Sequence, residues 1–168
     1  TMNGVSKSYA MTGWRIGYGA ATKEIIKAMA KLQSQSTTNP SSISQAAAVE
    51  ALNGNQDFML KRNQTFKERR DFVVETLNKI EGISCLKPNG AFYVFPNCLK
   101  FLNKKDKTGK IIKNDSDFVN SLLENYQVAV VQGSAFGLEG YFRISYATSM
   151  ENLKKALSKI SDYCKSLK

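Results

Sequence analysis

Apolar residues recur every three or four positions through most of the first 80 residues, the spacing of one face of an α-helix. This pattern predicts helices over about 23–35, 43–52 and 56–80. The second is rich in alanine, so we expect it to be well buried. The third is long enough to connect two domains. Two short segments, 1–6 and 16–21, predict strands ahead of the first helix, the second of them buried.

After residue 82 the pattern changes to short apolar runs separated by turn residues, which predicts strands. The expected strands span 83–86, 91–95, 128–131 and 141–146. Pro88-Asn89-Gly90 predicts a hairpin between the first two. Helices are expected over about 115–124 and 151–166, and 100–114 has the composition of a basic loop without core residues.

The order of elements differs between the two halves. The second half follows the order β-β-α-β-β-α, which is that of a compact α+β unit. The first half, strand, strand, helix, helix, has the order expected at the tail of a larger α/β sheet. The opening residues Thr1-Met2-Asn3-Gly4-Val5 look like the end of a strand, so we expect a fragment of a longer protein.

The charge balance changes this picture little. Of the 168 residues, 42% are hydrophobic and 23% are charged, which is typical of a soluble globular protein. The net charge of +10 is compatible with a nucleic-acid partner. The lysines, however, are scattered over helices and concentrated in one loop, with no repeating pattern of aromatic and basic residues. We therefore favour a lysine-rich composition and expect neither a nucleic-acid nor a membrane partner.

Cysteine and histidine content narrows the chemistry. Cys85, Cys98 and Cys164 are odd in number and widely spaced, which argues against a disulfide framework or a zinc site and favours a reducing cytoplasm. The chain has no histidine, which excludes histidine triads and histidine metal sites. Proton transfer falls to Lys, Asp, Glu, Tyr or Cys, and no metal is expected.

The stretch from Gly4 to Gly17 carries the main candidate chemistry. Lys7 lies among small, neutral residues, and Arg15 follows eight positions later, with no acid or base from Ser8 to Trp14. A desolvated lysine has the lowered pKa that a Schiff-base amine needs, and a guanidinium grips phosphate or carboxylate with a rigid fork. A surface lysine and a structural ion pair at Arg15 are the plainer alternatives.

Arg143 interrupts the predicted strand 141–146. By the two-residue period of a strand it shares a face with Tyr141 and Ser145. An arginine within an apolar strand is costly unless it is paired or faces an anionic ligand, so an internal salt bridge and a ligand site are about equally supported. The glycine-rich loop 133–140 matches no phosphate-binding motif and is interpreted as a connection that closes over a site.

The stretch Gly4-Val5-Ser6-Lys7-Ser8-Tyr9-Ala10-Met11-Thr12-Gly13-Trp14-Arg15-Ile16-Gly17 closely resembles the pyridoxal-phosphate attachment motif of class I, fold-type-I aminotransferases. Its residues are most similar to those of the bacterial aspartate and aspartate/prephenate aminotransferase subgroup. Three further segments extend the resemblance along the whole chain. They are Thr37-Thr38-Asn39-Pro40, Gly90-Ala91-Phe92-Tyr93 and Phe142-Arg143-Ile144-Ser145-Tyr146-Ala147-Thr148-Ser149.

The resemblance implies an α/β fold, the fold of pyridoxal-phosphate-dependent transferases. Residues 1–55 would be the end of the large coenzyme domain, and 56–168 the interdomain helix and the small α+β domain. Lys7 would hold the coenzyme as a Schiff base and transfer the proton, Arg15 would bind its phosphate, and Arg143 would bind the substrate α-carboxylate. A cytoplasmic homodimer is implied, acting on aspartate and 2-oxoglutarate, and on prephenate.

The same resemblance marks what residues 1–168 lack. The family's aspartate at the pyridine nitrogen and its other coenzyme contacts would lie upstream of Thr1, so we expect a C-terminal fragment that is inactive alone. Gly4 stands where some relatives place a phosphate-binding serine. The region 31–40 offers Lys31 but no arginine for a side-chain carboxylate.

Two alternatives remain open from the sequence. One is a related pyridoxal-phosphate enzyme, such as an aromatic aminotransferase or a carbon–sulfur lyase, which substrate profiling of the full-length protein would separate from an aspartate enzyme. The other is a non-enzymatic, basic nucleic-acid-binding module, which would bind DNA with a steep salt dependence.

Overall fold

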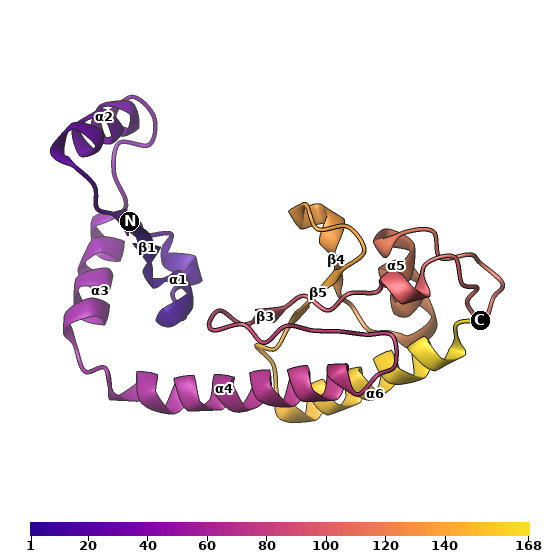
Figure 1. Ribbon diagram of the computed structural model, residues 1–168. Helices are drawn as coiled ribbons and strands as arrows, with labels where there is room; N and C mark the ends of the chain where they lie inside the picture. The colour runs from indigo at the N-terminus through magenta and orange to yellow at the C-terminus, as the bar shows by residue number, and fades with distance from the viewer. The chain divides into compact units, whose positions relative to one another are not determined.

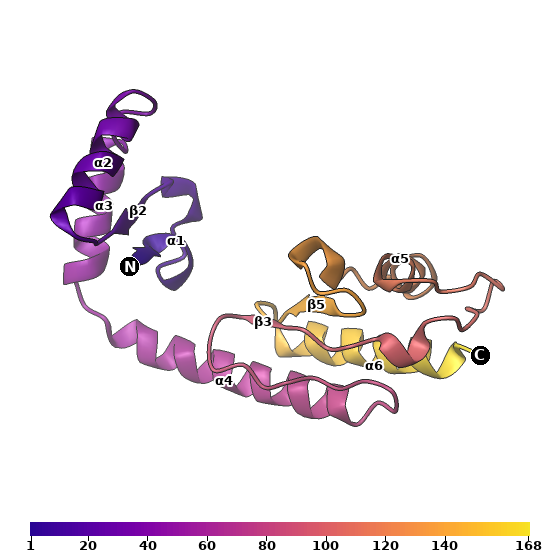
Figure 2. The same cartoon turned by 45° about the horizontal axis from the view of Figure 1, so that its top comes forward.

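The computed structural model describes residues 1–168, which divide into two compact units, Thr1–Lys61 and Arg62–Lys168 (Figures 1 and 2). The helices are α1 (Val5–Ser8), α2 (Lys23–Ser34), α3 (Ser42–Asn53), α4 (Asp57–Asn78), α5 (Asp115–Tyr126) and α6 (Met150–Ser166). The strands are β1 (Met2–Gly4), β2 (Gly17–Gly19), β3 (Tyr93–Val94), β4 (Val131–Gln132) and β5 (Phe142–Ser145). Three 3₁₀ turns complete the chain, η1 (Thr12–Trp14), η2 (Leu99–Phe101) and η3 (Gly133–Phe136).

The first unit has its predicted helices but almost no core of its own. Only Val5, Ser44 and Ala48 are buried among residues 1–61, and strand β2 is exposed throughout. The expectations of a buried strand at 16–21 and a well-buried α3 are therefore wrong for this chain. The alanines of α3 bury little surface, and no part of residues 1–61 covers the apolar side chains of α2 and α3. The exposed ones are Ile25, Ile26, Met29, Leu32, Ile43, Val49 and Leu52.

Helix α4 confirms the predicted long helix, beginning at Asp57 and ending at Asn78. The boundary between the two units falls inside it, between Lys61 and Arg62. Its last turns carry Val73, Val74 and Leu77 into the core of the second unit. We predict from the sequence that this helix connects two domains, and the assignment of the first unit to a large coenzyme domain stays a prediction.

The second unit is built on a three-stranded antiparallel sheet with the order β3-β5-β4. The predicted hairpin between 83–86 and 91–95 is wrong, because β3 pairs with β5 and residues 83–86 form no strand. The Asn78 side chain ties the 83–86 segment to α4. It accepts a hydrogen bond from Cys85 N at 2.8 Å and donates one to Cys85 O at 3.0 Å. The backbone groups of Cys85 therefore bond to α4 and are not available to a neighbouring strand.

Side chains alternate across this sheet, and one face makes the core. Val94 of β3 and Phe142 and Ile144 of β5 are buried in the same cluster as residues of α4 and α6. Both helices lie along that face of the sheet (Figures 1 and 2). The expected inward residues of the last helix are confirmed as buried; they are Leu153, Leu157, Ile160 and Tyr163.

Capping side chains fix where two helices begin. Ser149 accepts a hydrogen bond from Asn152 N at 3.2 Å and caps α6 as predicted. Helix α5 is capped by Asn114, whose side chain accepts from Asp117 N at 2.8 Å, and begins at Asp115. Phe118 of α5 packs on Phe142 of β5, with ring centroids 5.1 Å apart.

The basic loop before α5 is anchored by a buried carboxylate, contrary to the expectation of a loop without core residues. Asp106 Oδ1 accepts from the Thr108 hydroxyl at 2.6 Å and from the backbone N–H groups of Thr108 and Lys110 at 2.8 and 3.1 Å. Its Oδ2 accepts from the buried Ser121 hydroxyl at 2.7 Å and from Asn125 Nδ2 at 3.3 Å. The carboxylate thus ties the loop to α5.

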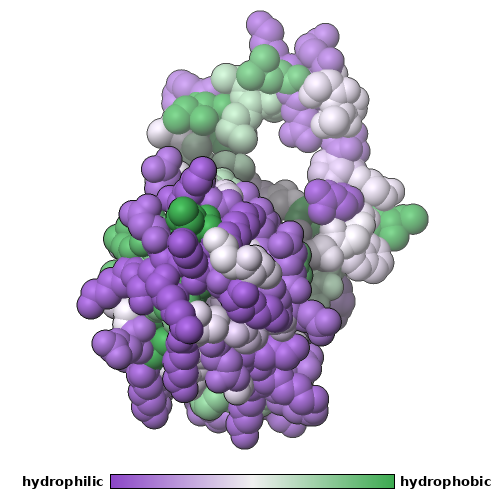
Figure 3. Space-filling view, turned by 90° about the vertical axis from the view of Figure 1, so that its right-hand side faces the viewer, coloured by the Kyte–Doolittle hydropathy of each residue, from purple (hydrophilic) through white to green (hydrophobic).

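The lysines of this loop remain at the surface. Lys105, Lys107, Lys110 and Lys113 are exposed. The end of the second unit near the C-terminus presents mainly hydrophilic side chains (Figure 3). None of the helices combines the length and apolar composition needed to cross a membrane.

The three cysteines are buried and free. Burial raises the pKa of the Cys85 thiol to about 11 and those of Cys98 and Cys164 to about 12. At neutral pH these side chains are therefore thiols, which pack as small apolar groups.

Asp106→Ala is expected to lower the free energy of unfolding by about 1–3 kcal/mol, because Ser121 and the loop amides lose their buried acceptor. Urea unfolding followed by circular dichroism measures this change. Glu124→Ala, at an exposed site on α5, is the control and is expected to shift stability by less than about 0.5 kcal/mol. Equal effects of the two substitutions would contradict the anchoring role.

The same carboxylate predicts a pH dependence. Burial raises the pKa of Asp106, but hydrogen bonds from Thr108, Ser121 and Lys110 outweigh it, so the pKa falls from 3.8 to about 2. A lowered folded-state pKa stabilises the fold above pH 4, and this contribution is lost as the pH falls toward about 2. The stability difference between the wild type and Asp106→Ala is therefore expected to shrink over that range.

Candidate active site

Lys7 and Arg15 lie in the connection between two paired strands. Gly4 at the end of β1 pairs with Gly17 at the start of β2, so both ends of the connection meet at one end of the small sheet. Lys7 is in the single helical turn α1, three residues after Gly4, and Arg15 comes two residues before Gly17. The register at Gly4 and Gly17 therefore brings the two cations to the same end of the sheet.

The backbone of this connection is held in uncommon conformations. Ala10 and Arg15 have positive φ angles of 54° and 51°, which L-residues other than glycine rarely adopt. Positive φ at non-glycine residues is concentrated in functional segments, where surrounding contacts hold it. The Arg15 guanidinium donates from Nη1 to Thr12 O at 3.0 Å, across the turn η1. This bond restrains the side chain and leaves its remaining donors available.

Tyr9 fastens the turn that carries Lys7. Its hydroxyl donates to Gln56 Oε1 at 2.9 Å, and its ring meets Phe58 edge-on at 6.1 Å. Val5, at the start of α1, is buried. These contacts fix the backbone on both sides of Lys7, while the Lys7 side chain itself is exposed. The expected desolvation of its amine is therefore not provided by residues 1–168.

The donors in this connection suit an aldehyde and a phosphate. Lys7 offers a primary amine, which condenses with a carbonyl, and Arg15 offers a planar fork of N–H groups, which matches phosphate oxygens. Both side chains are exposed, so both are accessible to a ligand. No cluster of three or more potential metal-ligating side chains occurs in residues 1–168.

Arg143 lies on the central strand β5, on the face opposite the core. The burial pattern along Phe142–Ser145 alternates, with Phe142 and Ile144 buried and Arg143 half-buried. The predicted sharing of a face with Tyr141 and Ser145 is therefore confirmed. None of the four ion pairs of the structure includes Arg143. The internal salt bridge weighed from the sequence is thus absent within residues 1–168.

Two aromatic rings hold the Arg143 guanidinium instead. Its Cζ lies 4.3 Å from the centroid of Tyr93 and 4.2 Å from the centroid of Phe136. Such stacking orients the planar group but leaves its N–H donors directed outward in the plane. An arginine held in this way is ready to bind an anion with two parallel hydrogen bonds.

The loop 133–140 supplies one of these rings. A Cβ at Gly133 would stand 2.2 Å from Leu138 O, so only glycine fits where this loop folds back. The buried carboxylate of Asp115 accepts from Ser134 N at 2.6 Å and fixes the start of η3. Phe136 ends that turn. The loop therefore serves Arg143 through a side chain and not through a phosphate-binding backbone.

The structure brings together Lys7 and Arg15 in the first unit and places Arg143 in the second. Sequence reasoning missed Tyr93 and Phe136 as partners of Arg143. The signal for Tyr93 was its position in the predicted strand 91–95, but the partner of that strand was misassigned. For Phe136, an aromatic residue inside a glycine-rich loop was the available signal.

Arg143→Met is expected to cost less than about 2 kcal/mol in the free energy of unfolding, because only two partly exposed cation–π contacts are lost. Arg70→Met provides the comparison. Arg70 pairs with Asp71 at 2.8 Å and donates to Pro88 O at 3.2 Å, so its replacement is expected to cost at least as much. Urea unfolding of both variants measures these changes. A loss of more than about 3 kcal/mol in the free energy of unfolding for Arg143→Met alone would show that Arg143 has a structural role.

Comparison with known proteins matches the sequence and the fold of this chain to an enzyme family. The family model for aminotransferase class I and II matches residues 1–160. The chain is 59% identical over 164 residues to an aspartate aminotransferase of Rhizobium meliloti, covering 98% of this chain and 40% of that relative. It is 56% identical over 167 residues to a probable aspartate/prephenate aminotransferase of Rickettsia typhi, covering 99% of this chain and 42% of that relative.

Solved structures agree in fold. The aspartate aminotransferase of Rhizobium meliloti superposes with a TM-score of 0.94 at 58% identity, over 100% of this chain and 42% of that one. The aspartate aminotransferase of Thermus thermophilus with maleate gives 0.86 at 40% identity, over 97% and 40%. The chain thus spans about two fifths of the length of these relatives. With almost the whole sequence matched by the family model, the chain belongs to the aminotransferase class I and II family.

Proposed function

We propose that the complete protein is a pyridoxal-phosphate-dependent aminotransferase that moves the amino group of L-aspartate to 2-oxoglutarate. The observation that carries this proposal is the connection between β1 and β2, where Lys7 and Arg15 occupy one end of a strand pair. The 59% identity to a relative named aspartate aminotransferase supports the choice of substrate. Prephenate, in the name of the Rickettsia typhi relative, is the second amino acceptor that we propose.

Two residues of this chain would hold the coenzyme. The Lys7 amine would bind its aldehyde carbon, and the Arg15 guanidinium would bind its phosphate as a charge-assisted pair. Pyridoxal phosphate, when bound, supplies an electron sink for the electrons of the breaking Cα–H bond. The exposed Lys7 side chain would gain its desolvation from parts of the complete protein outside residues 1–168.

Lys7 would also move the proton. Once the substrate amine has replaced it, the free Lys7 Nζ would take the proton from the substrate Cα as a general base and return a proton as a general acid. Among residues 1–168, which contain no histidine, Lys7 is the candidate for this role. Tyr9, fastened to Gln56, would keep the turn that carries Lys7 in register during both transfers.

Arg143 would bind the α-carboxylate of the amino acid. With its guanidinium between Tyr93 and Phe136, two parallel N–H donors would grip both carboxylate oxygens and orient the Cα–H bond for cleavage. The Thermus thermophilus relative was solved with maleate, a dicarboxylate, which supports a dicarboxylic donor. The group that binds the second carboxylate would lie outside residues 1–168.

We also propose that the complete protein is a homodimer in the cytoplasm, as the family resemblance implies.

Lys7→Ala in the complete protein is expected to abolish the pyridoxyl label that borohydride reduction fixes on the wild type, and to lower turnover by about 100-fold or more. Peptide mass spectrometry locates the label. Lys27→Ala, an exposed lysine on α2, is the matched control and is expected to keep both label and activity. A label that persists on another lysine in Lys7→Ala would refute the assignment.

Arg143→Lys in the complete protein is expected to raise the KM for aspartate by about tenfold or more, because an ammonium cannot reproduce the two-bond grip of a guanidinium. Steady-state kinetics with aspartate and 2-oxoglutarate measure this. An unchanged KM would show that Arg143 does not bind substrate.

The choice of aspartate is tested separately on the wild type. Faster turnover with an aromatic donor than with aspartate would show that the amino donor is aromatic.

A further inference from the structure

Asp115, the first residue of α5, is a buried acid without a cationic partner. It is 3% exposed, and none of the four ion pairs of the structure includes it. A buried charge that lacks an ionic partner costs free energy unless hydrogen bonds compensate for it. Helix α5 does not need this carboxylate as a cap, because the Asn114 side chain already caps it. The carboxylate therefore has a role other than capping.

The hydrogen bond that Asp115 accepts comes from the loop 133–140. Its Oδ2 accepts from Ser134 N at 2.6 Å, at the start of the turn η3. A carboxylate bonds a backbone N–H more strongly than a neutral oxygen does. Three residues further along α5, Phe118 packs on Phe142 in the core, with ring centroids 5.1 Å apart. The bond therefore connects the start of η3 to a helix that the core holds in place.

The turn η3 carries Phe136, one of the two rings at Arg143. Phe136 lies two residues after Ser134 and ends the turn. Its ring centroid is 4.2 Å from Arg143 Cζ. Gly137 N donates to Ser134 O at 3.1 Å, which closes the backbone around Phe136. Because this turn is one hydrogen-bonded unit, a shift of Ser134 would move the Phe136 ring with it.

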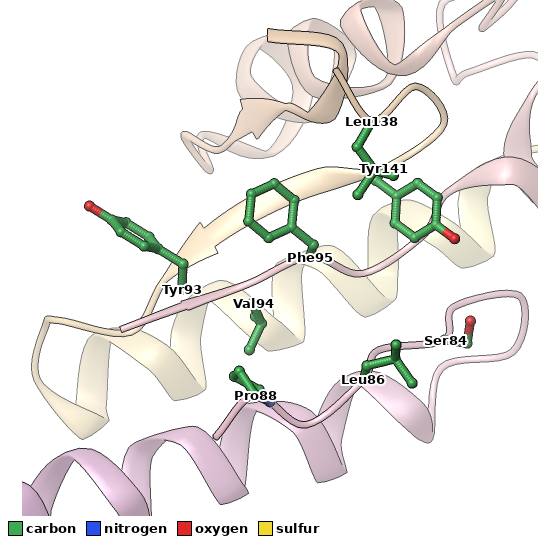
Figure 4. Close-up of a pocket in the computed structure, with 8 residues that line it drawn as sticks. All are labelled: Ser84, Leu86, Pro88, Tyr93, Val94, Phe95, Leu138 and Tyr141. Atoms are coloured by element: carbon green, nitrogen blue, oxygen red, sulfur yellow. The ribbon is translucent and has the colours of Figure 1, made fainter. Parts of the chain in front are cut away.

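Apolar packing restrains the Phe136 ring only in part. Tyr93 and Phe95 project from the same side of β3 and its extension (Figure 4). Phe95 meets Phe136 edge-on, with ring centroids 5.7 Å apart, yet Phe136 remains 46% exposed. Further along the loop, Leu138 is 40% exposed and lines a pocket of about 380 Å³ (Figure 4). The polar contact at Ser134 is therefore the firmer restraint on this ring.

We propose that Asp115 is a positioning residue for substrate binding, because its carboxylate holds η3 so that Phe136 stays stacked on the Arg143 guanidinium. This inference rests on the proposed function, in which Arg143 binds the α-carboxylate of the amino acid. An arginine that is free to change rotamer has to be ordered when it binds a carboxylate, and this ordering weakens the binding. Stacking by Phe136 orders the guanidinium before the substrate arrives. Asp115 thus acts through Ser134 and Phe136.

A purely structural anchor would give a different result. Any effect that it had on substrate affinity would be the same with or without the guanidinium at position 143. A residue that acts through Arg143 loses its effect on affinity when that guanidinium is replaced. The change is expected mainly in KM, because the carboxylate grip is made in the bound substrate as well as in the transition state.

The test measures the KM for aspartate in the complete protein. Asp115→Ala is expected to raise KM by about threefold or more and to change kcat by less than about twofold, as for the loss of one cation–π contact. In an Arg143→Lys background the same substitution is expected to change KM by less than about 1.5-fold. Asp117→Ala is the matched control and is expected to keep the wild-type KM. Asp117 lies in the same turn of α5 but accepts from Lys113 N, at 3.0 Å, in the basic loop.

Two further variants separate the hydrogen bond from the fold. Asp115→Asn keeps an oxygen that can accept from Ser134 N, and its KM is expected to stay within about twofold of the wild type. Asp115→Leu has a similar volume but no acceptor, and fills the buried site without a charge. It replaces Asp115→Ala if that variant does not fold, with the same expected rise in KM.

Crystal structures of the complete protein test the geometry without catalysis. The Phe136 centroid is expected to lie within about 6 Å of Arg143 Cζ in the wild type and beyond that distance in Asp115→Ala. A ring that stays in place in the variant would overturn the inference. An unchanged KM in Asp115→Ala, or an equal rise in both backgrounds, would overturn it and leave the proposed function standing. An unchanged KM in Arg143→Lys would refute the proposed role of Arg143, and the inference with it.

Discussion

The alternation of side chains along β5 is the constraint on which the second unit depends. Phe142 and Ile144 are committed to the core against α4 and α6, so Arg143 has to lie on the other face. A slip of one residue in register would bury a guanidinium among apolar side chains and expose two core residues, at a cost of several kcal/mol. The packing of the core therefore also fixes the direction of the one arginine with a proposed role in substrate binding.

Local patterns in the sequence were sufficient for the helices and for the face of β5. Helix α4 and helix α6 followed from helical periodicity, and the position of Arg143 followed from the two-residue period. Strand pairing between residues far apart in the chain could not be predicted from these local patterns. Strand β3 pairs with β5, and Asn78 takes up the backbone groups of Cys85. Nothing in the local pattern near 83–95 signals either of these contacts.

In the candidate site, too, residues in a local motif were predictable and residues brought in by tertiary folding were not. Lys7 and Arg15 were found from a contiguous motif, whereas Tyr93 and Phe136 are brought to Arg143 by tertiary folding. The expected desolvation of Lys7 was not found in these residues, because the first unit buries only three side chains. The two units thus differ in how much of their apolar surface they bury. The second has a continuous core of its own, and the first presents exposed apolar helices together with the coenzyme-type residues.

The buried cysteines have a practical consequence. Reaction with maleimide or iodoacetamide requires an accessible thiolate, and Cys85, Cys98 and Cys164 are buried, with pKa values of about 11 to 12. Toward such reagents the folded second unit behaves as a cysteine-free background. A fluorophore or spin label introduced through one surface cysteine would therefore report from a single known position, without prior removal of the native thiols.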